Sequence, residues 1–99
     1  MPDFNIVIMP SAQNDMQEIF DFIAKDNLSK ANEMLNLFER KIQSLACFPK
    51  IGYRKSIFVE RDIREYVVAK HYQIIYHIKN NTIYVLRVLT GYENFFNIF

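Results

Sequence analysis

The apolar residues of this 99-residue chain change their spacing near the middle, and this change constrains the fold more than any other feature. From Ala12 to Cys47 they recur every three or four residues, which is the pattern of amphipathic helices. From Ile57 to Leu89, short runs rich in Val, Ile and Tyr are separated by polar pairs, which is typical of strands. Helices followed by several strands favour an α+β fold.

The helical half is predicted to begin with a strand and then form two helices. Residues 4–9 contain three consecutive β-branched residues and end at Pro10, so they are expected to form the first strand. Ser11 and Asn27 are candidate N-caps of the two helices. Because only a few residues separate the helices, they should pack as an antiparallel hairpin.

Three strands are predicted in the second half, over residues 66–69, 72–78 and 82–89. Lys70-His71 and Asn80-Asn81 are interpreted as two-residue hairpin turns, which gives an antiparallel meander. The predicted fold is therefore a single α+β domain over residues 1–99. An N-terminal strand precedes an antiparallel helical hairpin, and the hairpin packs on one face of a mainly antiparallel, curved β-sheet.

These turns fix an expected register and two sheet faces. They place Ala69 opposite Tyr72, and Ile74 opposite both Val67 and Arg87. The face expected to lie under the helices consists of Glu65, Val67, Ala69, Tyr72, Ile74, Tyr76, Ile78, Ile83, Val85, Arg87 and Leu89. The face expected to stay open consists of Arg64, Tyr66, Val68, Gln73, Ile75, His77, Tyr84, Leu86 and Val88. An open apolar face on a small domain indicates a partner site.

Composition excludes several classes of protein. Cys47 is the only cysteine, so an internal disulfide and a Cys-built zinc site are excluded, and a cytoplasmic location is expected. No apolar run approaches the roughly 20 residues that span a bilayer, so no membrane partner is expected. The sequence has no metal-ligand cluster and no Gly-rich phosphate loop, so neither a metal nor a cofactor is expected.

The charges are distributed unevenly along the chain. Residues 1–47 carry four basic and seven acidic side chains, whereas residues 48–99 carry eight basic and four acidic ones. The connector over residues 48–56 holds a basic loop of Lys50, Arg54 and Lys55. These three cations are candidate contacts to phosphate, although a solvated loop explains them equally well.

Several segments, taken in order, resemble one family. They are the helix exit Leu45-x-x-x-Pro49-x-x-Gly52, the run Arg64-Glu65-Tyr66-Val67-Val68, the run Tyr72-x-Ile74-Ile75-Tyr76, and the run from Val85 through Arg87 to Gly91. Together they resemble the RelE/ParE superfamily of toxins from bacterial type II toxin-antitoxin modules, also called plasmid stabilisation proteins. The resemblance implies a small toxin that a cognate antitoxin neutralises by covering its exposed apolar surface.

The superfamily has two activities. RelE-like members are ribosome-dependent endoribonucleases that cut mRNA, and their pattern has basic residues where this chain has Gln73 and Glu93. If this chain were such a nuclease, Arg64, His77 and Tyr66 would be its candidate catalytic residues. ParE-like members instead bind DNA gyrase and trap it on cleaved DNA, without a known catalytic constellation. The resemblance favours the ParE-like branch, so the chain is more readily interpreted as a gyrase inhibitor than as an enzyme.

The candidate partner-binding residues are Arg64, Tyr66, Gln73, Arg87, Tyr92, Phe95 and Phe96. Arg87 is flanked by apolar residues, so a structural salt bridge is as plausible for it as a partner contact. The aromatic tail either folds back on the sheet or docks into a partner. A third interpretation is a family member that binds its antitoxin but has lost toxicity. A homodimer and a toxin–antitoxin hetero-oligomer both stay open.

Overall fold

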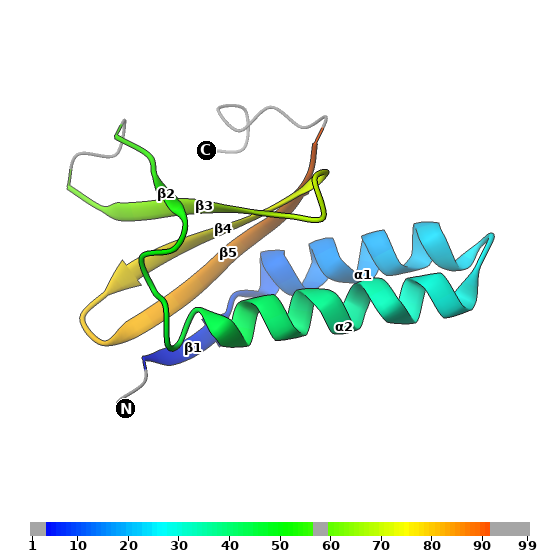
Figure 1. Ribbon diagram of the computed structural model, residues 1–99, viewed down its shortest axis with the longest axis horizontal. Coiled ribbons are helices and arrows are strands. Elements are labelled where there is room, and N and C mark those ends of the chain that lie inside the picture. Colours follow the sequence, from blue (N-terminus) through cyan, green and yellow to red (C-terminus); the bar gives the residue numbers. More distant parts are fainter. Residues whose placement is uncertain (1–3, 57–59, 92–99) are drawn as a thin grey trace.

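The computed structural model describes residues 4–56 and 60–91 of the chain (Figure 1). Its elements are β1 (Asn5–Ile8), α1 (Pro10–Ala24), α2 (Leu28–Ser44), β2 (Tyr53–Arg54), β3 (Asp62–Val68), β4 (Tyr72–Lys79) and β5 (Thr82–Thr90). The predicted α+β order of a strand, a helical hairpin and further strands is confirmed. The short β2, which lies within the connector, was missed because two residues carry no periodicity.

The strands form one five-stranded sheet in the order β1-β5-β4-β3-β2. β1 is parallel to β5, whereas the other neighbours are antiparallel. A parallel pair needs a long crossover connection, and β1 is separated from β5 by the helical hairpin and the other strands. Both helices lie on one face of the sheet, and their connecting turn projects beyond it (Figure 1).

The two helices begin in different ways. α1 has Pro10 in its first turn and Met9 as its N-cap, with no side-chain cap, so the prediction of Ser11 as N-cap is wrong. Proline suits this position because its fixed φ matches the helix and it lacks an N–H that would need an acceptor. In α2 the side chain of Asn27 accepts a hydrogen bond from the backbone N–H of Lys30 at 3.0 Å, which confirms the predicted cap.

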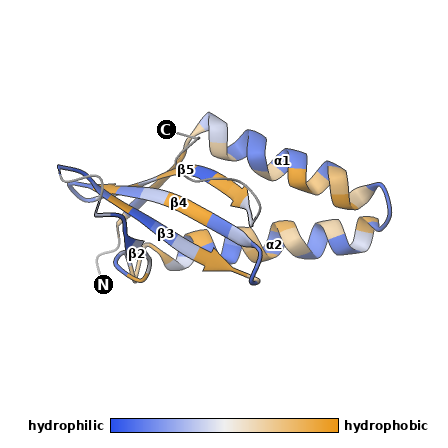
Figure 2. Cartoon of the chain, turned by 90° about the horizontal axis from the view of Figure 1, so that it is seen from above, coloured by the Kyte–Doolittle hydropathy of each residue, from blue (hydrophilic) through white to orange (hydrophobic). Residues whose placement is uncertain are grey.

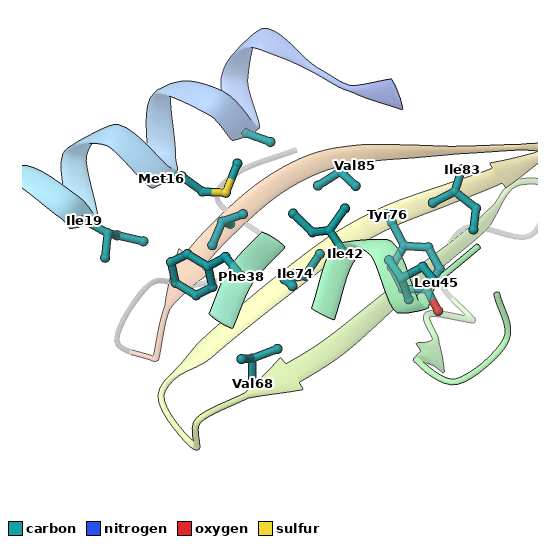
Figure 3. Packing of buried hydrophobic residues seen from close by; sticks show 12 residues of the cluster. Met16, Ile19, Phe38, Ile42, Leu45, Val68, Ile74, Tyr76, Ile83 and Val85 are labelled. Carbon is teal, nitrogen blue, oxygen red and sulfur yellow. The ribbon is translucent and has the colours of Figure 1, made fainter. Parts of the chain in front are cut away.

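The main core lies between the hairpin and the sheet. Hydrophobic and hydrophilic residues alternate in short stretches along both helices, as expected for amphipathic helices (Figure 2). Side chains from α1, α2 and the strands converge in the space between them (Figure 3). The buried members are Ala12, Met16, Ile19, Phe38, Ile42, Leu45, Val68, Ile74, Tyr76, Ile83, Val85 and Val88. A second, smaller buried cluster contains Ile63, Ile75 and Leu89.

The expected register between β3 and β4 is wrong by one residue. Val68, not Ala69, lies opposite Tyr72, so three residues form the connection instead of two. Ala69 and Lys70 both adopt positive φ, at 52° and 68°, which allows this three-residue turn to close. A one-residue shift exchanges the two faces of a strand. Val68 is therefore buried in the main core, whereas Val67 is 53% exposed.

The register between β4 and β5 is confirmed only near its turn. Lys79 lies opposite Thr82 across the Asn80-Asn81 turn, as predicted. Further along, a register shift places Val85 opposite Tyr76 but Arg87 opposite Ile75, so the predicted pairing of Ile74 with Arg87 is wrong. A bulge adds one unpaired residue and exchanges the faces beyond it.

The bulge and the three-residue turn together account for the misassigned faces. Beyond the bulge, Val88 contributes to the main core and Leu89 to the second cluster, the reverse of the expected arrangement. Glu65, Val67 and Leu89 were expected under the helices, but their register partners place them on the other face. Neither irregularity leaves a signal in the hydrophobic pattern, because both depend on how two strands meet.

In the described segments, no helix combines the length and the low charge that crossing a bilayer requires.

Candidate functional site

Arg87 lies at the edge of the sheet, next to α1. Its Nε and Nη2 donate to the two carboxylate oxygens of Asp15, at 2.6 and 2.8 Å. β1 pairs with β5 only as far as Val85, so the rest of β5 has no strand beside it on that side. Asp15 takes that place and accepts a further hydrogen bond from the backbone N–H of Val88 at 2.9 Å. Arg87 thus forms the structural salt bridge that was one of its two predicted roles.

Arg64 lies under the connector, and the prediction that it sits on an open face is wrong. It lies opposite Tyr76 in the register, and only 13% of its side chain is exposed. Its Nη1 donates to the carbonyl oxygens of Lys50 and Gly52, at 3.3 and 3.0 Å, and its Nε pairs with Asp62 at 2.9 Å. Arg64 therefore ties the connector to the sheet.

Tyr76 secures the same connector from within the core. Its hydroxyl donates to the carbonyl oxygen of Pro49 at 2.7 Å and accepts from the backbone N–H of Gly52 at 2.9 Å. Burial raises the pKa of this hydroxyl above 10.0, while the hydrogen bond from Gly52 and the charge of Arg64 oppose the shift. A β-carbon at Gly52 would meet the Tyr76 hydroxyl at 2.8 Å, which explains why the close approach uses glycine.

The remaining candidate side chains are dispersed. Tyr66 is half-buried against the main core, because it lies opposite Ile74. Gln73 is half-buried and lies opposite Val67 and Leu89 on the other face. The candidates Tyr92, Phe95 and Phe96 lie outside the described residues.

The predicted nuclease residues do not converge. Arg64 and Tyr66 share register rows with the core residues Tyr76 and Ile74, on the helix-covered face. His77 shares its row with Ile63, which belongs to the second cluster on the opposite face. General acid–base chemistry needs its groups within hydrogen-bond reach of one reacting atom, and these three side chains do not meet that condition.

The basic connector is partly neutralised by the sheet beside it. Lys55 Nζ lies 2.6 Å from a carboxylate oxygen of Glu65, and Arg54 Nε lies 3.7 Å from one of Asp62. Lys50 is exposed. The connector also exposes apolar side chains, namely Phe48, Ile51 and Tyr53. Its surface is therefore both apolar and basic, a mixture that the count of basic residues did not reveal.

Two open depressions lie beside these residues. The first, of about 550 Å³, lies between α1 and the end of β5. Its lining includes the Asp15–Arg87 pair, Glu18 and the exposed ring of Phe22. This depression combines a satisfied ion pair with exposed apolar surface, which suits contact with a protein side chain.

The second depression, of about 450 Å³, lies where β3 begins and β4 ends. It is lined by Arg54, Glu60, Arg61, Asp62, His77, Ile78 and Lys79. Burial lowers the pKa of His77 below 6.5, and the nearby charges of Arg61 and Lys79 lower it further. Arg54 and His77 were candidates from the sequence, whereas Arg61 and Lys79 were not, because only strand pairing brings residues 61 and 79 to the same end of the sheet.

The described residues include no group of three or more His, Cys, Asp or Glu side chains positioned to hold a metal ion. Cys47 is exposed and forms no disulfide.

Comparisons with known proteins agree with the fold. A family model described as "ParE toxin of type II toxin-antitoxin system, parDE" matches residues 6–95. A search of curated proteins gives no significant match. A solved structure titled "Chromosomal ParDE TA system from P. aeruginosa" is similar with a TM-score of 0.73 and 15% sequence identity, covering 91% of this chain and 98% of that chain. At that identity, the structural similarity concerns the fold alone.

Proposed function

Because the chain belongs to the ParE toxin family of type II toxin-antitoxin systems, we propose that it inhibits DNA gyrase by direct binding and that a cognate antitoxin neutralises it. The family match is the observation that carries this proposal. The antitoxin is expected to be encoded beside the toxin and to cover part of its exposed apolar surface.

The contacts of Arg64 and Arg87 support a binding protein more than a nuclease. Arg64 donates to the Gly52 carbonyl in the connector and pairs with Asp62, and Arg87 pairs with Asp15. Neither guanidinium lines the depression that contains His77, a half-buried strand residue whose pKa is lowered below 6.5 by burial and by the charges of Arg61 and Lys79. An mRNA-cleaving site would need cations and a proton acceptor around one phosphate.

Exposed apolar side chains in two places are suited to protein partners. Phe22 is 73% exposed on α1, and Tyr53 is 77% exposed in the connector. Exposed aromatic side chains are common at protein interfaces, because binding removes their apolar ring surface from water. Two such places are enough for separate contacts with a target and with an antitoxin.

A supercoiling assay tests the proposal directly. Purified chain is added to DNA gyrase, ATP and relaxed plasmid, and the products are resolved after protein digestion. We expect inhibited supercoiling together with linear, cleaved plasmid. Prior addition of the antitoxin from the neighbouring reading frame should restore supercoiling, and this serves as the matched control.

A parallel translation extract distinguishes the alternatives. If supercoiling proceeds normally while mRNA is cut at codon-dependent positions, the chain is a RelE-like nuclease and the proposal is wrong. If neither reaction changes although the antitoxin binds, the chain has kept its partner and lost its toxicity, which also contradicts the proposal.

A further inference from the structure

We propose that the depression where β3 begins and β4 ends is a binding site for a phosphate group, with Arg54, Arg61 and Lys79 as its cations. This end of the sheet lies away from the tip of the helical hairpin (Figure 1). The site is separate from the Asp15–Arg87 pair, and it shares only Arg54 with the basic loop predicted from the sequence.

The three cations come from separate parts of the chain. Arg54 lies on β2, Arg61 precedes β3, and Lys79 ends β4. The antiparallel pairing of β3 with β4 places Asp62 opposite Ile78, and therefore brings residues 61 and 79 to the same end of the sheet. The sheet thus fixes the backbone positions of Arg54 and Lys79 and places Arg61 directly before β3, so these exposed side chains extend from one end of the sheet.

The charge balance of the depression is positive. It contains two carboxylates, but Asp62 already accepts a 2.9 Å bond from Arg64 and lies 3.7 Å from Arg54. Glu60 is the other acidic side chain in the lining. Among the described residues, neither Arg61 nor Lys79 forms a salt bridge, and the three cations of the lining outnumber its two carboxylates.

The His77 ring lines the same depression as these cations. Burial lowers its pKa below 6.5, the charges of Arg61 and Lys79 lower it further, and the charge of Asp62 opposes the shift. The Tyr84 ring contacts the His77 ring, with 6.1 Å between ring centroids. An anion bound here would be stabilised by the cations and would favour protonation of His77.

Phosphate is the anion that this group of side chains suits best. Guanidinium groups offer two parallel N–H donors that match two phosphate oxygens, and the lysine adds a point charge. The depression is open, so a phosphate within a longer polymer can enter without being fully dehydrated. The same chemistry serves a nucleic-acid backbone and a free phosphate, and the experiment below separates these sources.

The experiment follows His77 by NMR in the full-length chain at low salt, without gyrase. Inorganic phosphate, a short single-stranded DNA and a short DNA duplex are titrated separately. We expect at least one of them to shift the His77 ring signals and to raise its pKa. Binding only by DNA identifies a nucleic-acid backbone as the source, whereas equal effects of inorganic phosphate identify a free phosphate.

A charge-matched pair of variants tests the location. The double variant Arg61→Gln, Lys79→Gln removes two cations from the depression, and Lys30→Gln, Arg40→Gln removes two from α2. We expect the first variant to weaken binding about tenfold and to flatten its salt dependence, since each lost phosphate contact lowers that slope. The second variant should bind like the wild type.

Two results would overturn the proposal. One is the absence of any His77 response to all three probes at low salt. The other is an equal loss of affinity in both double variants, which would indicate only a general dependence on the net charge of the chain. Thermal melts test whether both variants fold. If the Arg61→Gln, Lys79→Gln variant does not fold, the single variant Arg61→Gln takes its place. Because gyrase is absent, these results are independent of the supercoiling assay.

Discussion

The guanidinium of Arg87 and the carboxylate of Asp15 are joined by two hydrogen bonds of 2.6 and 2.8 Å, which link α1 to the edge of β5. Asp15 is 8% exposed and is the only charged residue buried among those described. The carboxylate of Asp15 also accepts a hydrogen bond from the backbone N–H of Val88. One side chain therefore neutralises Arg87 and provides an acceptor for a strand edge that has no neighbouring strand. Asp15 and Arg87 are 72 residues apart in sequence, so this ion pair forms only when α1 packs on the sheet.

Replacing Asp15 with Asn should destabilise the domain by about 2–4 kcal/mol, because the half-buried Arg87 loses the carboxylate charge that accepts two of its hydrogen bonds. Urea unfolding followed by circular dichroism measures the free energy of unfolding. Glu18→Gln, one turn further along α1 and exposed, is the matched control and should change it by less than about 0.5 kcal/mol. Equal stability of the two variants would show that the ion pair contributes nothing.

Tyr76→Phe should cost about 1–3 kcal/mol, because the Gly52 N–H and the Pro49 carbonyl both lose their partner near the core. The Gly52 amide should also exchange with solvent faster than in the wild type, which hydrogen exchange detects. Tyr53→Phe removes a hydroxyl from a side chain that is 77% exposed, so it serves as the control. Unchanged exchange at Gly52 would mean that the hydroxyl does not hold the connector.

Arg64→Ala should lower the free energy of unfolding by about 1–3 kcal/mol, since it frees the Lys50 and Gly52 carbonyls and leaves Asp62 with a weaker partner. Lys cannot reproduce this fork, so Arg64→Lys should recover only part of the loss. Thermal denaturation measures both. If Arg64→Ala unfolds at the same temperature as the wild type, the contacts of Arg64 do not stabilise the domain, and a role in binding a partner is favoured.

Lys70→Gly should stabilise the domain by about 0.5–1 kcal/mol, because Lys70 holds a φ of 68° that glycine adopts without steric cost. The same change at Lys79, in a strand, should be destabilising, which provides the contrast. Paired urea titrations measure the difference. A loss of stability for Lys70→Gly would contradict this prediction. It would show that the steric strain relieved in the folded state is worth less than the conformational entropy that glycine adds to the unfolded chain.

His77 should titrate below 6.5 in the folded chain. The unfolded chain then binds the proton more tightly, so the contribution of His77 to stability falls as the pH drops through 6.5 and levels off below the folded pKa. Arg61→Gln should raise the His77 pKa, whereas Lys30→Gln on α2 should leave it unchanged. NMR titration of the ring measures both, and an unmoved pKa in Arg61→Gln would place the two side chains too far apart to interact.

The sequence by itself determined the order of the elements other than the short β2, the helical hairpin, the Asn27 cap and the turn at Asn80-Asn81. These features depend on local propensity and periodicity, which a single strand or helix expresses without its neighbours. The resemblance to the RelE/ParE toxins came from the same local segments, and the family match agrees with it.

Only the tertiary structure decided the faces of β3 and β5 and the surroundings of the charged residues. A three-residue turn at Ala69–His71 and a bulge near Ile75 each moved the register by one position, and one position is enough to exchange a core side chain with a surface one. Arg64 and Arg87 have acceptors that are distant in sequence, and strand pairing places Arg61 and Lys79 in the lining of one depression. Such neighbours exist only after the chain has folded, because pairing and packing set them and local pattern does not.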